Sequence, residues 1–103
     1  MGTKTKIQVL VYRPGQPGVV EEHMNSLEAQ QALVGGYIEA VAMGDGIYLT
    51  CNEEGKLNGL EPNFLLPGDV IVGNVFFCRV DDAGECASVT ETDIARIRRK
   101  VGR

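Results

Sequence analysis

The chain opens with alternating apolar and polar positions, which is the pattern of a strand with one buried face. From Lys4 to Arg13 the buried face is expected to carry Ile7, Val9 and Val11. The opposite face is expected to carry the residues between them, namely Lys6, Gln8, Leu10 and Tyr12. The turn cluster PGQPG (residues 14–18) follows, and residues 19–23 can return as a short antiparallel strand. The pattern therefore predicts an N-terminal hairpin.

A short helix is predicted after Asn25. This residue precedes LEAQQALVGG, and Glu28 follows three residues later, as in an N-cap with a supporting carboxylate. Leu27, Leu33 and Val34 form a narrow apolar stripe, and Gly35 is placed to end the helix in a left-handed conformation. The helix should span about two to three turns.

A second hairpin is predicted from the alternation in YIEAVAM (residues 37–43) and from residues 47–51. Gly44, Asp45 and Gly46 lie between the two runs, and glycine permits the positive φ that tight turns require.

The remaining segments are shorter. Residues 64–67 are apolar but have a proline at each flank, which favours a turn or packed loop over a central strand. Strands are expected at 69–72, 75–80 and 85–89, with Gly73 and Asn74 forming a bulge or tight turn. Thr90 and Asp93 have the spacing that caps a C-terminal helix over residues 91–101.

This order of elements predicts an α+β fold: a largely antiparallel sheet of about five to seven short strands, with two helices, one after Asn25 and one after Thr90. At 103 residues the chain is expected to form a single domain, 1–103.

Composition restricts the class of protein. With 44% hydrophobic and 23% charged residues, the chain has the balance of a globular protein. Its apolar runs are far shorter than the roughly 20 residues that cross a bilayer, and no signal peptide is visible, so we expect a cytoplasmic protein without membrane contact. Cys51, Cys78 and Cys86 have no metal-ligand spacing, and His23 is distant in sequence, so neither a metal site nor a cofactor is expected.

The stretch CNEEGKLNGLEPN (residues 51–63) is the candidate ligand site, because binding groups often lie on loops held by a rigid sheet. Amides and carboxylates together suit a small polar ligand such as a nucleotide base or ribose. The alternative is that asparagine and glycine serve only the backbone geometry of the loop. The candidate residues, with two that precede the loop, are Tyr37, Glu39, Asn52, Glu53, Glu54, Lys56, Asn58 and Asn63.

The C-terminal segment is basic. From Glu91 to Arg103 there are two acids and five bases, which give this segment a net charge of +3. The net charge of the whole chain is −4, so the residues before this segment carry −7. Contact with nucleic-acid phosphates is the alternative function, through Arg96, Arg98, Arg99 and Lys100. Against it, the rest of the chain is acidic, and bases near a helix C-terminus are expected from the helix dipole alone.

No nucleophile, base and orienting group can be named together, so no catalytic residue is assigned and an enzyme is not expected. His23 lies beside Glu21 and Glu22, which indicates a solvated surface strand. A protein partner or a homodimer would instead require an exposed apolar patch, for which the candidates are Phe64, Leu65, Phe76 and Phe77.

The resemblance to a known family rests on four blocks of the sequence: LVGGYIEAV, YLTCNEEGKLNGLEPN, GDVIVGNVFF and SVTETDIARI. From about Ile7 to Ile97 it resembles the domain-of-unknown-function family DUF3846, found in phages, conjugative elements and gut-type bacteria. The resemblance implies a setting among accessory genes of mobile elements, some of them near antirestriction genes. It implies no activity, substrate or catalytic residue. The expected function is that of a non-enzymatic accessory binding module, which sequesters a small polar ligand or counters host defence.

Overall fold

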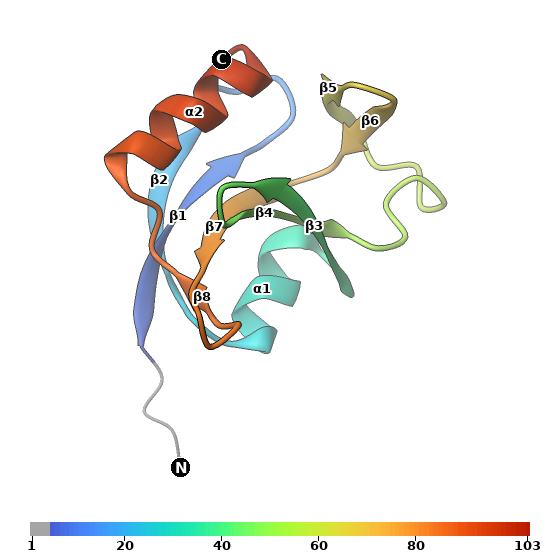
Figure 1. Ribbon diagram of the computed structural model, residues 1–103. Helices are drawn as coiled ribbons and strands as arrows, with labels where there is room; N and C mark the ends of the chain where they lie inside the picture. Colours follow the sequence, from blue (N-terminus) through green and yellow to red (C-terminus); the bar gives the residue numbers. More distant parts are fainter. Residues whose placement is uncertain (1–4) are drawn as a thin grey trace.

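The computed structural model describes residues 5–103 and has the α+β architecture predicted from the sequence (Figure 1). Lys4, where the first predicted strand began, lies outside these residues. The elements are β1 (Lys6–Tyr12), β2 (Val19–Met24), α1 (Leu27–Val34), β3 (Ile38–Gly44), β4 (Ile47–Asn52), β5 (Pro62–Leu66), β6 (Asp69–Val72), β7 (Val75–Val80), β8 (Cys86–Ala87) and α2 (Glu91–Val101).

Most strands form one antiparallel sheet with the order β2-β1-β7-β4-β3, and β8 pairs with β7. The hairpins β1–β2 and β3–β4 were both predicted and are both confirmed. β7 lies between them, with Leu10 of β1 and Leu49 of β4 both opposite Phe77. Residues close in sequence thus form the two halves of the sheet, and β7 joins them.

The inner strands of the sheet are covered on both faces, and this corrects the prediction for the first strand. Ile7, Val9 and Val11 pack with Val34 of α1 on one face, as expected of buried positions. Leu10 and Tyr12, assigned to the solvent face, are also fully buried, in a second cluster under α2. Alternation reveals one buried face, but it does not reveal whether a later segment covers the other.

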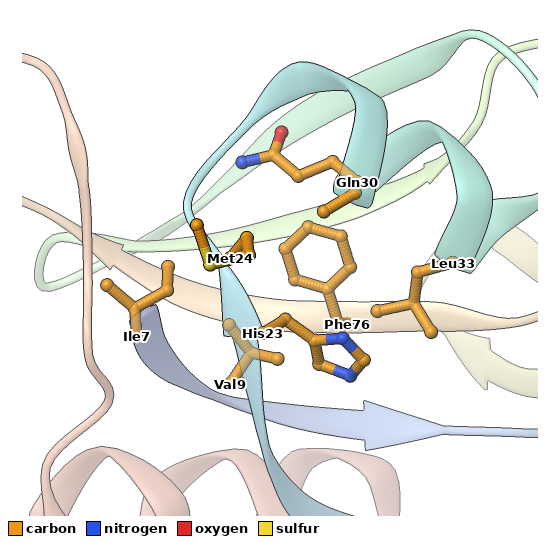
Figure 2. A pocket seen from close by; sticks show the side chains of 8 residues that line it. Ile7, Val9, His23, Met24, Gln30, Leu33 and Phe76 are labelled. Atoms are coloured by element: carbon orange, nitrogen blue, oxygen red, sulfur yellow. The ribbon is translucent and has the colours of Figure 1, made fainter. Parts of the chain in front are cut away.

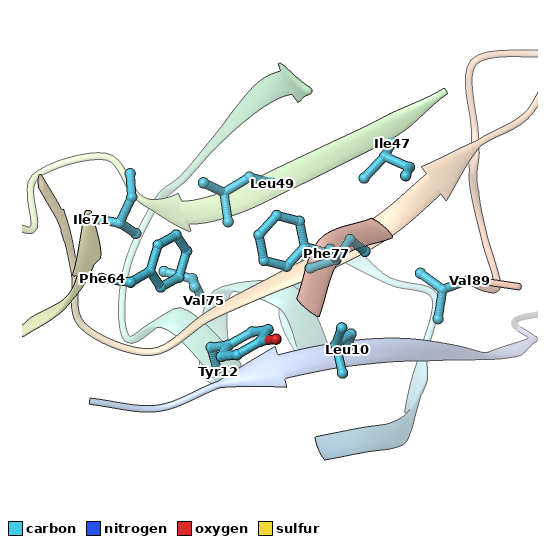
Figure 3. Packing of buried hydrophobic residues seen from close by; sticks show 10 residues of the cluster. Leu10, Tyr12, Ile47, Leu49, Phe64, Ile71, Val75, Phe77 and Val89 are labelled. Carbon is cyan, nitrogen blue, oxygen red and sulfur yellow. The ribbon is translucent and has the colours of Figure 1, made fainter. Parts of the chain in front are cut away.

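The second cluster is built around aromatic rings (Figure 3). Tyr12 makes edge-on contacts with Phe64 and Phe77, at ring-centroid distances of 5.7 and 5.9 Å. Phe64 comes from β5, which pairs with β6 as a separate two-stranded hairpin. Residues 64–67 were predicted to be a turn or loop rather than a central strand; most of them are in fact strand, although outside the main sheet. Gly73 and Asn74 mark the point where the chain passes from this hairpin into β7.

The cap of α1 is one residue later than predicted. Ser26 accepts a hydrogen bond from the Ala29 backbone at 3.1 Å, whereas the Asn25 side chain donates to the carbonyl of Cys86 at 3.1 Å. Gly35 ends the helix with φ of 82°, as predicted.

The predicted cap of α2 is confirmed. Thr90 accepts from the Asp93 backbone, and the Asp93 carboxylate accepts from the Thr90 backbone at 2.9 Å. The same carboxylate is fully buried and receives two hydrogen bonds from Arg79 of β7, at 2.9 and 2.6 Å. One side chain therefore starts the helix and attaches it to the sheet.

Candidate functional site

The candidate loop leaves the end of β4 and runs through consecutive turns to β5. Its backbone is tied to the preceding structure, because Glu53 donates to the carbonyl of Tyr37 at 2.8 Å. Within the loop, Asn58 donates to Glu54 at 2.9 Å and Leu60 donates to Gly55 at 3.0 Å. The loop is compact and hydrogen-bonded internally, as the sequence predicted.

Asn52 fixes this loop against α1. Its side chain is buried, donates to the carbonyl of Val34 at 3.2 Å and accepts from the Glu54 backbone at 2.8 Å. The contact needs a residue without a side chain at position 36, where a Cβ atom would lie 2.8 Å from the Asn52 amide nitrogen. Asn52 thus holds the loop and the end of α1 at a fixed separation.

The space between these two segments forms an open hollow of about 320 Å³, which we call the Tyr37 hollow. The side chain of Tyr37 is 69% exposed. The lining combines this ring with amides, a carboxylate and two glycines, from Gln31, Gly35, Gly36, Tyr37, Asn52, Glu54 and Asn58. Four predicted site residues, Tyr37, Asn52, Glu54 and Asn58, therefore line one hollow.

Three other predicted residues, Glu39, Glu53 and Lys56, line a different hollow of about 140 Å³, bordered by β6. There Lys56 is paired with Asp69, and this hydrogen bond, with one from the Val70 backbone, holds the pKa of the Asp69 carboxyl below its usual value. Burial raises the pKa of the Cys51 thiol, with a smaller contribution from the negative charge of Glu39. The ammonium group of Lys56 in this second hollow is thus already paired with the carboxylate of Asp69.

Asn63 lies in neither hollow. Its buried side chain donates to the carbonyls of Tyr12 and Gly73, at 2.9 and 2.7 Å, and accepts from Arg103 at 2.6 Å. Arg103 also donates to the backbone carbonyl of Asn63 at 2.7 Å, and its own carbonyl accepts from the Tyr12 hydroxyl at 2.6 Å. The two residues link β1, β5 and the end of the chain, so the contacts of Asn63 are architectural.

The bases proposed for nucleic acid all project from α2 into solvent. Arg96, Arg98, Arg99 and Lys100 are exposed, and Arg96 lies 3.5 Å from the carboxylate of Asp45. Three of the four lie in the last turn of the helix, where positive charge offsets the helix dipole.

The apolar patch considered for a partner protein does not lie on the surface as a unit. Phe64 and Phe77 are buried in the core (Figure 3), and so is Phe76. Of the four residues, only Leu65 is exposed, at 72%.

His23 lies beside a small apolar gap between β1, β2 and α1, lined among others by Ile7, Leu33 and Phe76 (Figure 2). The gap measures about 10 Å³, which is about the least that one water molecule needs. The His23 ring lies 2.8 Å from the carboxylate of Glu21. Arg13 donates hydrogen bonds to both oxygens of the same carboxylate. The hydrogen bond from Arg13 is the main reason that the pKa of Glu21 falls to about 2.

Two residues were not predicted from the sequence: Gln31, which lines the Tyr37 hollow, and Arg103, which binds Asn63. Gln31 borders the Tyr37 hollow because of the way α1 packs against the loop, and sequence alone carries no signal for that packing.

Among residues 5–103, no group of three or more His, Cys, Asp and Glu side chains is placed to hold a metal ion. In the same part of the chain, neither helix is long and apolar enough to cross a membrane.

The chain has a small α+β fold, in which the inner strands of the sheet are covered on both faces and a polar loop lies beside the end of the first helix. The chain belongs to the family described as Domain of unknown function (DUF3846), which matches residues 7–102. No curated protein and no solved structure matches the chain.

Proposed function

We propose that this protein is a non-enzymatic binding module that takes up a small, planar, polar ligand in the Tyr37 hollow. The observation that carries the proposal is the exposed ring of Tyr37, which lies in one hollow with the polar side chains of Gln31, Glu54 and Asn58. An exposed aromatic ring offers a stacking surface, worth about 1–3 kcal/mol for a nucleobase.

The polar groups favour a ligand whose edge both donates and accepts hydrogen bonds. The amides of Gln31 and Asn58 can do either, whereas the carboxylate of Glu54 accepts only. A nucleobase or nucleoside offers such an edge together with a flat face for Tyr37.

The charge of the lining narrows the ligand class further. Glu54 supplies a negative charge, and the lining that residues 5–103 form contains no Lys or Arg. Lys56 lies in the second hollow and is paired with Asp69 there. An anionic phosphate would therefore meet repulsion, and the expected ligand is a neutral or cationic base or nucleoside.

The biological setting comes from the family resemblance, which implies accessory genes of phages and other mobile elements. In that setting, sequestration of a nucleoside-like molecule would be one way to counter a host defence.

Native mass spectrometry of the protein purified from cells, followed by denaturation, tests for a retained small molecule. Saturation-transfer NMR with the common nucleobases and nucleosides then tests binding directly. We expect Tyr37→Ala to weaken binding by about 5–150-fold, the equivalent of the stacking energy.

Glu54→Gln and Glu53→Gln form a matched pair, because these neighbouring acids line different hollows. Only Glu54→Gln is expected to change the affinity. A protein that is purified bare and binds none of the nucleosides at millimolar concentration would overturn the proposal, as would binding that survives Tyr37→Ala unchanged.

A further inference from the structure

Two of the three cysteines lie side by side although they come from different strands. The sulfur atoms of Cys78 in β7 and Cys86 in β8 are 3.3 Å apart. Because Cys86 pairs with Val80, Cys78 is its diagonal neighbour on the same face of the sheet. A disulfide has a sulfur–sulfur distance of about 2.05 Å, so the two atoms need only approach by about 1.2 Å. β8 is only two residues long, and within residues 5–103 it pairs with β7 alone, so a small displacement of this strand can supply that approach.

The two thiols are not equivalent. Cys78 is buried, at 1% exposure, whereas Cys86 is only partly buried and can be reached from solvent. The thiol of Cys78 donates a hydrogen bond to the sulfur of Cys86, and the side-chain amide of Gln30 donates to the same sulfur at 3.6 Å.

These contacts favour the thiolate of Cys86. The hydrogen bond from Cys78 is the main reason that the pKa of Cys86 falls to about 7, even though burial and the charges of Asp81 and Glu85 act in the opposite direction. The same hydrogen bond, together with burial, raises the pKa of Cys78. The accessible thiol is therefore the stronger nucleophile at neutral pH, and the buried thiol keeps its proton.

We propose that Cys78 and Cys86 form a redox-reactive pair that is reversibly oxidised to a disulfide by low-molecular-weight disulfides such as oxidised glutathione. The Cys86 thiolate attacks one sulfur of the reagent, forming a mixed disulfide and releasing one thiol. Cys78 then attacks the sulfur of Cys86, loses its proton and releases the second thiol. Overall, two protein thiols are oxidised to one disulfide, and one molecule of reagent is reduced to two thiols.

Cys51 provides an internal comparison. Its thiol donates to the main-chain oxygen of Glu39 at 3.7 Å, and burial raises its pKa. At pH 7, alkylation by iodoacetamide should therefore be roughly fivefold or more faster at Cys86 than at Cys51, once the lower intrinsic nucleophilicity of a thiolate with a lower pKa is allowed for.

The test uses the full chain, reduced and then equilibrated with oxidised and reduced glutathione at pH 7, followed by an acid quench. Intact mass and peptide mapping should show the loss of two hydrogens and a link between Cys78 and Cys86, reversed by dithiothreitol. Closure of this short loop should raise the Tm by about 10 °C.

Three variants assign the roles. Cys51→Ser should form the disulfide as the unmodified chain does, and Cys86→Ser should form none. Cys78→Ala should stop at the mixed disulfide on Cys86, because the second thiol is missing. The proposal is overturned if the unmodified chain accumulates a stable mixed disulfide without a Cys78–Cys86 link, or if Cys51 reacts first.

Discussion

Asp93 is the side chain whose loss should most clearly destabilise the fold. Its fully buried carboxylate accepts from the Thr90 backbone and from two nitrogens of Arg79. Asp93→Ala removes all three bonds, and with them both the reciprocal cap of α2 and the link between α2 and β7.

The magnitude follows from these contacts. Loss of a helix cap costs about 1 kcal/mol, and each hydrogen bond to a charged group is worth about 1.5–3 kcal/mol. Arg79 limits the loss, because it is 34% exposed and keeps a hydrogen bond to the carbonyl of Asp45 at 3.0 Å. The expected decrease in the free energy of unfolding is therefore about 2–4 kcal/mol, below the upper range for an uncompensated buried ion.

Urea unfolding followed by far-UV circular dichroism measures this decrease, and the absence of tryptophan makes circular dichroism preferable to fluorescence. Asp82→Ala is the matched control, because it removes the same charge from an exposed turn and should change stability by less than about 0.5 kcal/mol.

The pH dependence provides a second, independent check. Arg79 holds the pKa of Asp93 well below its ordinary value of 3.8, so the stabilisation is complete above that pH and is lost as the pH falls below it. The difference between the unmodified chain and Asp93→Ala should therefore be largest near pH 7 and should shrink below about pH 4. A loss of less than 1 kcal/mol at pH 7, or a difference that stays constant down to pH 3, would refute the reasoning.

Two further predictions concern residues that the sequence offered as functional. Asn63→Ala should destabilise the fold by about 2–4 kcal/mol in urea, because it leaves two buried carbonyls without their partner, whereas exposed Asn58→Ala should cost less than about 0.5 kcal/mol. If the helix bases only offset the helix dipole, the protein should leave a DNA column at low salt, and the triple change Arg98→Ala, Arg99→Ala, Lys100→Ala should not alter that elution. Retention that is sensitive to salt and lost in the triple variant would instead establish the nucleic-acid alternative.

The sequence predicted best the features that depend on neighbouring residues. The turn at Gly44, Asp45 and Gly46 needs only local positive φ values, and these three residues have φ of 92, 57 and 79°. The pairing of Thr90 with Asp93 is also local, since both partners belong to the first turn of one helix.

Features that depend on distant partners were predicted less well. Asn52 and Asn63 are indistinguishable in sequence, since both are asparagines of the same polar stretch. The side chain of Asn52 binds the end of α1, whereas that of Asn63 binds β1 and Arg103. In the same way, nothing near Leu10 in sequence indicates that α2 will cover it. For α1, Asn25 and Ser26 are both good capping residues, and the contact of Asn25 with Cys86 leaves the cap to Ser26.

The position of β7 has a consequence for the kinetics of folding. The hairpins β1–β2 and β3–β4 can each close through short connections, but neither completes the sheet until β7 enters between them. That step brings Phe77 against Leu10, far away in the chain, and the closure entropy of the long intervening loop opposes it before the aromatic core can form. Insertion of β7, rather than formation of either hairpin, should therefore set the folding rate of this domain.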